Sequence, residues 1–177
     1  MIVALAPVSG GHFNPAITVG LWVTKRVGTL QAVLYCATQL AGAIAAGYIL
    51  VALLPEATWR PVSLGATDLA TDFTRMNGML IEGLATFLVT FVFFACMSDV
   101  ASGTRPSGGI AVGLIVALDV LFVQPFTGAS MNPARTFGPA LAAHHWLNHG
   151  VYWVGPLFGG VVGAVAYEYL FVSESES

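Results

Sequence analysis

The residues best suited to handle a small polar solute are two copies of Asn-Pro-Ala and an arginine that follows the second copy. They are Asn14, Pro15 and Ala16, then Asn132, Pro133, Ala134 and Arg135. Asn is among the best N-cap residues and Pro is favoured at the first helical position, so each copy predicts the start of a helix. A helix N-terminus carries a partial charge of about +0.5, and an Asn amide can donate to the oxygen of water. Two such ends at one point would repel cations and protons but admit neutral polar molecules.

No set of Ser, His and acidic residues has the arrangement of a nucleophile with its base, so the sequence predicts transport and no enzymatic activity. His144, His145 and His149 cluster after the second motif. A metal there would need a further ligand at helical spacing, and the sequence offers none. We therefore expect no metal and no cofactor.

Composition places the chain in a membrane. Of the 177 residues, 56% are hydrophobic and 8% are charged, whereas soluble proteins have roughly 25% charged residues. Four nearly uncharged runs are long enough to cross the bilayer, and they cover residues 27–53, 77–97, 108–126 and 150–172. The net charge of −3 and six scattered Lys and Arg residues make no basic surface for nucleic acid. We expect a multi-pass integral membrane protein with the lipid bilayer as partner, in a plasma or inner membrane rather than an organelle.

The two motifs open apolar segments, about residues 16–24 and 133–143, that are too short to span at 1.5 Å per residue. They belong to a duplication, because residues 9–20 align without gaps on residues 127–138 and share the Asn-Pro-Ala, a Thr and a Gly. Three predicted spans separate the two copies, and an odd number of crossings brings them into the membrane from opposite faces. The sequence thus predicts an inverted repeat whose half-helices meet at the midplane.

The expected fold is one all-α membrane domain over residues 1–177, with about four spanning helices and two re-entrant half-helices. Residues 1–75 would hold a partial first repeat and an extracellular connection. Residues 76–172 would hold the second repeat, and residues 173–177 an acidic tail. For Asp119, inside the third span, we expect a hydrogen bond between helices rather than a contact with solute.

Residues 9–16 (Ser-Gly-Gly-His-Phe-Asn-Pro-Ala) and 128–141 (Gly-Ala-Ser-Met-Asn-Pro-Ala-Arg-Thr-Phe-Gly-Pro-Ala-Leu) resemble the major intrinsic proteins, the aquaporins and aquaglyceroporins. The resemblance covers essentially the whole chain. It implies a channel for water and other small neutral solutes, one pore per protomer and a homotetramer. It also implies that Glu82 is a buried scaffold residue that accepts hydrogen bonds from a re-entrant loop. The implied selectivity filter comprises Arg135, Ala129 and Val120, and the implied pore-lining carbonyls are those of Gly10, Gly11, His12, Gly128 and Ser130.

The residues around the filter bear on the solute. Glycerol facilitators usually carry Asp directly after the filter Arg, whereas Thr136 follows Arg135 here, so water is favoured over glycerol. Val120 and Ala129 are small and apolar, which resembles the filter of the vacuolar and ammonia-permeable branch. The resemblance therefore implies water as the main solute and ammonia, urea or hydrogen peroxide as a second one.

One departure from the family leaves an alternative open. Only Met1–Val8 precede Ser9, where the family has two full helices. We expect the first helix and most of the second to be missing, so that the chain is N-terminally truncated. A non-conducting membrane fragment that lacks one pore wall is then the second hypothesis. A secondary transporter is disfavoured, because no carboxylate pair or proton relay lies along the spans.

Overall fold

The computed structural model describes residues 1–98 and 108–172, and within these ranges the regular structure is helical. Between the second and third predicted spans the sequence leaves a short connection over residues 98–107, and all of it except residue 98 lies outside the described residues. The predicted acidic tail, residues 173–177, also lies outside them.

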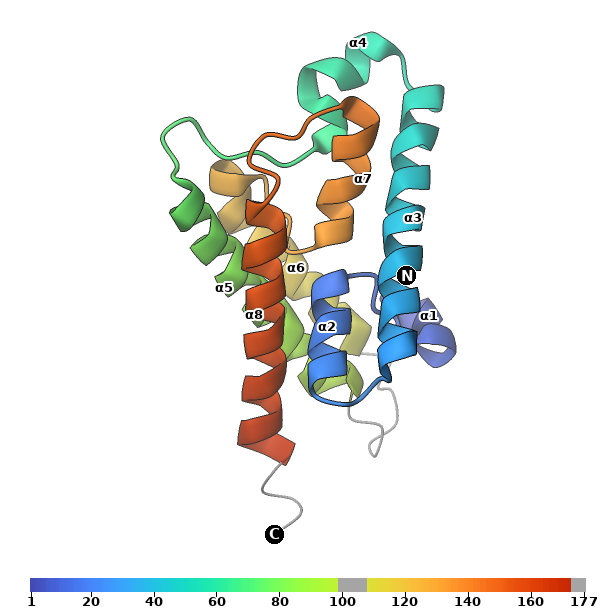
Figure 1. The fold of residues 1–177 in the computed structure, drawn as a ribbon, viewed down its shortest axis with the longest axis vertical. Helices are drawn as coiled ribbons and strands as arrows, with labels where there is room; N and C mark the ends of the chain where they lie inside the picture. Colours follow the sequence, from blue (N-terminus) through green and yellow to red (C-terminus); the bar gives the residue numbers. More distant parts are fainter. Residues whose placement is uncertain (99–107, 173–177) are drawn as a thin grey trace.

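Four long helices confirm the four predicted spans (Figure 1). They are α3 (Thr29–Leu53), α5 (Arg75–Phe93) with its π-helical extension η2 (Phe94–Ser98), α6 (Gly108–Thr127), and α8 (Val151–Tyr167) with its π-helical extension η4 (Glu168–Val172). Local chemistry sets several of their ends. Thr74 caps α5 by accepting from the backbone N–H of Asn77, and Pro55 follows α3 where its ring cannot continue a helix.

The remaining helices are short. α1 (Ile2–Ser9) precedes the first motif, and α4 (Glu56–Trp59) with the 3-10 helix η1 (Arg60–Gly65) lies in the connection after α3. The two half-helices are α2 (Pro15–Val23) and α7 (Pro133–Ala143). Figure 1 shows α7 above α2 between the long helices, with the two N-terminal ends facing each other near mid-height.

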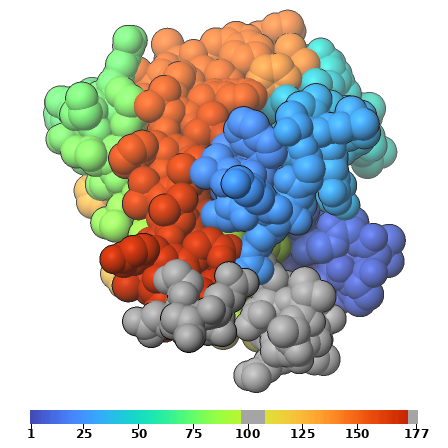
Figure 2. Space-filling view, turned by 60° about the horizontal axis from the view of Figure 1, so that its bottom comes forward, coloured from blue at the N-terminus to red at the C-terminus, as the bar shows by residue number. Residues whose placement is uncertain are grey.

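Each half-helix packs against the long helix that follows the other half-helix, so α2 contacts α8 and α7 contacts α3. Figure 2 shows the orange-to-red surface of α8 beside the blue surface around α2. Glycine permits this close approach. A Cβ added to Gly160 would lie 2.7 Å from the carbonyl oxygen of Ala16, and one added to Gly138 would lie 2.2 Å from that of Ala43. The exchange of partners locks the two repeats into one body.

The tightest pairing of long helices is that of α5 with α8, and it too is made through glycines. A Cβ on Gly159 would lie 1.9 Å from the carbonyl oxygen of Gly83, and one on Gly163 would lie 2.7 Å from that of Phe87. In contrast, only 6% of the most apolar stretch of α3 is buried inside the protein. The corresponding share is 44% for the span Arg75–Cys96 and 39% for Val151–Val172. The core of this chain therefore sits around α5 and α8.

Asp119 does not make all of the contacts expected of it. The side chain is buried at 6% exposure in α6, but its Oδ2 has no hydrogen-bond partner within the part of the chain that the structure describes. The prediction of a hydrogen bond between helices is wrong for this oxygen, because no donor of a neighbouring helix lies within hydrogen-bond distance of it among the described residues.

Candidate functional site

Each Asn-Pro-Ala motif caps its own half-helix. Asn14 Oδ1 accepts from the backbone N–H of Ala16 at 2.9 Å, and Asn132 Oδ1 accepts from that of Ala134 at 3.0 Å. Pro15 and Pro133 take the first helical positions, where no N–H is needed. The capping chemistry read from the sequence thus appears in both halves with the same geometry.

The same two Asn side chains tie the halves together. Asn14 Nδ2 donates to the carbonyl of Met131 at 2.8 Å, and Asn132 Nδ2 donates to the carbonyl of Phe13 at 3.0 Å. Each amide reaches the loop that precedes the other motif, over sequence separations of 117 and 119 residues. An Asn amide carries two N–H donors, so each crossing bond leaves one donor for a further acceptor.

The backbone of the two loops is bent by left-handed residues. Gly10 and Gly11 have φ of 75° and 70°, and Gly128 has φ of 77°. Ala129 and Met131 also have positive φ, both 52°, which is rare for residues with a Cβ and marks a backbone held by its surroundings. Such turns point carbonyls away from a helical or extended path, as a lining for polar solute requires.

Tyrosines support the two loops in the same way. Tyr35 donates from its hydroxyl to the carbonyl of Ser9 at 3.1 Å, and Tyr152 donates to the carbonyl of Thr127 at 2.8 Å. Ser9 and Thr127 are aligned positions of the duplication. In the sequence Tyr35 follows Asn14 by 21 residues and Tyr152 follows Asn132 by 20 residues, so this nearly equal spacing has a structural cause.

A second pair of aligned contacts joins each loop to its half-helix. His12 Nδ1 lies 2.9 Å from the hydroxyl of Thr18, and the hydroxyl of Ser130 bonds to that of Thr136. The carbonyl of His12 accepts from Gln39 Nε2 at 2.7 Å. This carbonyl, expected to line the pore, is therefore held by α3.

The carboxylate of Glu82, in α5, supports the second loop through hydrogen bonds. The side chain is fully buried; its Oε1 accepts from the hydroxyl of Thr127 at 2.6 Å and from the N–H of Ser130 at 2.9 Å. Its Oε2 accepts from the N–H of Met131 at 2.6 Å. One carboxylate therefore satisfies three donors of a loop that has no helical partners.

The three expected filter residues come from different elements. Arg135 is exposed at the start of α7, and its Nη1 donates to the carbonyl of Gly65 at 2.7 Å. Val120 is half-buried in α6 and packs against the core cluster that contains Ala129, whose side chain is only 3% exposed. Among the contacts of the described residues, the hydrogen bond of Arg135 goes to the connection after α3 and not to either of the other two residues.

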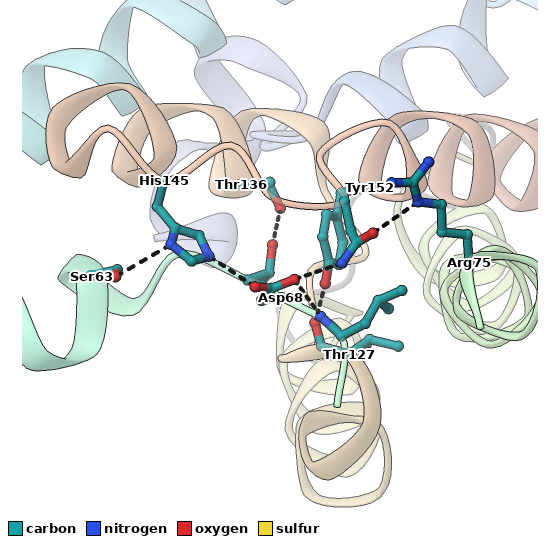
Figure 3. Close-up of polar contacts among 10 residues, drawn as sticks. Ser63, Asp68, Arg75, Thr127, Thr136, His145 and Tyr152 are labelled. Carbon is teal, nitrogen blue, oxygen red and sulfur yellow. Dashed lines mark hydrogen bonds and ion pairs between the residues drawn. The ribbon is translucent and has the colours of Figure 1, made fainter. Parts of the chain in front are cut away.

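The part of the site that sequence reasoning missed is this connection (Figure 3). Thr67 lies 2.9 Å from Thr136, hydroxyl to hydroxyl. Asp68 Oδ2 lies 3.1 Å from His145 Nε2, and Asp68 Oδ1 accepts from Asn148 Nδ2 at 3.0 Å. No spacing or motif in the sequence predicts these contacts, since they join residues that are 69 to 80 positions apart.

The histidines after α7 have structural contacts. His144 ends α7 with a left-handed φ of 55°, and His149 Nε2 accepts from Trp153 Nε1 at 3.0 Å. That bond requires an unprotonated Nε2, and burial lowers the pKa of His149 accordingly. The residues that the structure describes contain no group of three or more metal-ligating side chains.

Several known proteins are similar to this chain in sequence. Aquaporin-4 from Bos taurus is 39% identical over 176 residues, which covers 99% of this chain and 54% of that protein. Aquaporin TIP4-1 from Zea mays is 46% identical over 165 residues, covering 93% of this chain and 63% of the relative. Two maize TIP proteins among the relatives agree with the resemblance of the filter to the vacuolar branch. The chain spans about half to two thirds of the length of these curated relatives.

The fold has a counterpart among solved structures. The X-ray structure of the aquaglyceroporin from Plasmodium falciparum superposes with a TM-score of 0.84 at 19% identity, covering 99% of this chain and 78% of that one. The family model described as "Major intrinsic protein" matches residues 1–167. With this match and with both Asn-Pro-Ala motifs meeting end to end, the chain belongs to the major intrinsic protein family.

Proposed function

We propose that this chain forms a channel for passive movement of water across a membrane and that it excludes protons and ions. The observation that carries the proposal is the pair of crossed bonds by which Asn14 and Asn132 bring two helix N-termini together. The positive ends of α2 and α7 disfavour a cation at the point where they meet. Family membership agrees with a channel and not with an enzyme.

The remaining amide donors supply the proposed exclusion of protons. Asn14 and Asn132 each have one N–H beyond the crossing bond, and a water that accepts from both turns its own hydrogens outward. A chain of waters oriented in this way cannot relay a proton through its centre. Arg135 adds a fixed positive charge beyond this point, and the carbonyls of Gly10, Gly11, Gly128 and Ser130 are the proposed acceptors along the path.

Stopped-flow light scattering on liposomes that contain the purified chain tests the proposal. We expect osmotic water flux above that of empty liposomes, together with a proton flux, read from an internal pH dye, that stays at the lipid background. Arg135→Ala should raise both urea flux and cation leak above the wild-type values. Arg60→Ala is the matched control, because Arg60 is exposed and contacts Glu56 and the ring of Trp59, both outside the proposed filter. Equal solute profiles for the two variants would contradict the role of Arg135.

Ammonia is the proposed second solute. Val120 and Ala129 bring no polar side chain to the filter, and Ala129 is small and buried. Substituting Val120→His would add a polar ring and narrow the path, so it should lower ammonia flux more than water flux. Ammonia uptake, followed by internal alkalinisation in the same liposomes, measures this ratio. A wild-type chain that moves water but no ammonia would limit the function to water.

The non-conducting alternative has an observation of its own in favour. Arg135 is exposed and Phe13 is 44% exposed, so the described residues of one chain cover the site only in part, and a closed lumen needs a further surface opposite them. Liposome permeability no higher than background, with the chain inserted, would establish this alternative. Glycerol transport is the weaker option, since Thr136 and not Asp follows Arg135.

We also propose that the chain assembles as a homotetramer. Within each chain, we propose that residues 1–75 hold a partial first repeat and a connection, residues 76–172 the second repeat, and residues 173–177 an acidic tail. Apolar side chains exposed along α3, including Leu30, Val33 and Leu53, are compatible with contact to lipid or to another subunit. Sedimentation in detergent, corrected for bound detergent, measures the number of chains per particle.

A further inference from the structure

The segment of residues 63–68, in the connection between α3 and α5, presents a carbonyl to Arg135. The carbonyl is that of Gly65, and it accepts from Arg135 Nη1 at 2.7 Å. Ser63, Leu64 and Gly65 have successive φ values of 47°, 55° and 73°. Residues with a Cβ rarely adopt this left-handed conformation, and such a turn persists only where other contacts hold it. The direction of the Gly65 carbonyl therefore depends on anchors elsewhere in the segment.

Asp68 is the strongest anchor of residues 63–68 (Figure 3). Its Oδ1 accepts from the N–H of Leu69 at 2.8 Å and from Asn148 Nδ2 at 3.0 Å, and its Oδ2 lies 3.1 Å from His145 Nε2. Arg75 Nε donates to Asn148 Oδ1 at 2.9 Å. Because Arg has only donors, the Asn148 oxygen turns toward Arg75 and its NH₂ group turns toward Asp68. Arg75 thus fixes the orientation of Asn148, which in turn donates to the carboxylate of Asp68.

The contact between Asp68 and His145 differs from an ordinary surface ion pair. The side chains of His145 and Asp68 are 23% and 28% exposed, and the carboxylate has three partners, whereas an isolated exposed ion pair contributes little. Between Gly65 and Asp68, Thr67 is buried at 3% exposure and bonds to Thr136. The segment is therefore fastened at two consecutive residues, Thr67 and Asp68, shortly after the Gly65 carbonyl.

We propose that Asp68 is a positioning residue for Arg135: by binding His145 and Asn148 it fixes the strained turn, so that the Gly65 carbonyl holds the guanidinium in one orientation. The inference rests on the proposed function, in which Arg135 is part of the selectivity filter. Without Asp68 the turn relaxes, Arg135 loses its acceptor, and the filter passes larger neutral solutes.

Asp68→Asn tests this with little change in shape. The matched control is Glu56→Gln in the same connection, because Glu56 is exposed and pairs only with exposed Arg60 among the described residues. The first readout is independent of conduction: the ¹⁵N-labelled guanidinium signals of Arg135 in detergent micelles, assigned by their loss in Arg135→Lys. We expect Asp68→Asn to speed hydrogen exchange at Arg135 by about tenfold, the value of one charge-assisted hydrogen bond, and Glu56→Gln to leave it unchanged.

His145→Leu supplies a second route to the same loss, since it keeps the carboxylate but removes one partner of Asp68 together with the contact of His145 Nδ1 to the Ser63 hydroxyl at 3.5 Å. It should move the Arg135 signals in the same direction as Asp68→Asn. In liposomes, the ratio of urea to water permeability should rise severalfold for both variants and stay at the wild-type value for Glu56→Gln.

The outcomes separate the two proposals. Arg135 signals that match the wild type in both variants would overturn the inference, even if residues 63–68 became more mobile, because Asp68 would then support the loop alone. A wild-type chain that conducts no water would overturn the proposed function, while the Arg135 signals would still decide the role of Asp68.

Discussion

The two re-entrant loops are built on one plan but are held with different strength. Both carry an Asn cap, a crossing amide bond and a tyrosine that donates to the first carbonyl of the loop. The second loop also rests on the carboxylate of Glu82, which accepts three hydrogen bonds. The corresponding support of the first loop is the neutral amide of Gln39.

The surrounding helices differ in the same sense. Glu82 and Tyr152, which hold the second loop, belong to α5 and α8, whose apolar stretches are 44% and 39% buried. Gln39 and Tyr35, which hold the first loop, belong to α3, whose apolar stretch is only 6% buried. Duplicating a sequence pattern has therefore reproduced the geometry of the loop but not the set of groups that hold it. We expect the second half to be the more rigid of the two.

The largest effect expected from this difference is that of Glu82→Gln. The new amide would face donors with its own NH₂ group and leave buried N–H groups unpaired, so we expect a loss of about 3 kcal/mol or more in the free energy of unfolding. Gln39→Leu should cost about 1 kcal/mol, since neutral hydrogen bonds are lost in a less buried place. Unfolding titrations in mixed micelles measure both, and equal losses would remove the distinction between the loops.

Aligned glycines give the next comparison. A Cβ on Gly138 would lie 2.2 Å from the backbone oxygen of Ala43, whereas one on Gly20 would lie 3.0 Å from the side chain of Ala164. Gly138→Ala must push two backbones apart and should cost about 2 kcal/mol or more. Gly20→Ala should cost less than about 1 kcal/mol, because a few tenths of an ångström suffice. The same titration tests the pair, and a larger cost at Gly20 would contradict the packing seen here.

Removing each tyrosine hydroxyl should have a smaller effect. Tyr152 is fully buried, so Tyr152→Phe leaves the carbonyl of Thr127 without that donor and should cost about 1 kcal/mol. Tyr35 is half-buried, and water can replace its hydroxyl at Ser9, so Tyr35→Phe should cost only about 0.5 kcal/mol. Amide hydrogen exchange of each loop, compared with the wild type, would show whether the loosening stays in the half where the hydroxyl was removed.

The smallest effect is expected on the exposed face of α3. Leu34 is 55% exposed, and lipid tails are as apolar as its side chain, so Leu34→Ala should change the unfolding free energy by less than about 0.5 kcal/mol. Val89→Ala in α5, at 2% exposure, is the buried control and should cost more than about 1 kcal/mol. A costly Leu34→Ala in detergent would indicate that α3 is covered by another surface, as the proposed tetramer would provide.

The sequence by itself determined the four spans, the two half-helices and their meeting from opposite faces. Hydrophobic length, capping chemistry and the parity of crossings are local or countable properties, and for that reason Pro15–Val23 and Pro133–Ala143 could be predicted closely. Of the candidate site, the sequence also supplied the two Asn side chains, because they sit at fixed places within the repeated segments. Glu82 came from the family resemblance alone.

The tertiary structure alone decided which groups satisfy one another. Asp68 and His145 lie 77 residues apart, and Asn14 and Met131 lie 117 apart. Partners at such separations depend on the path of the whole chain, and spacing in the sequence carries no trace of them. Spacing likewise could not show that Asp119 Oδ2 has no partner within the described residues, where a bond between helices was expected. Periodicity and capping specify elements, whereas long-range hydrogen bonds become readable only once the elements have packed.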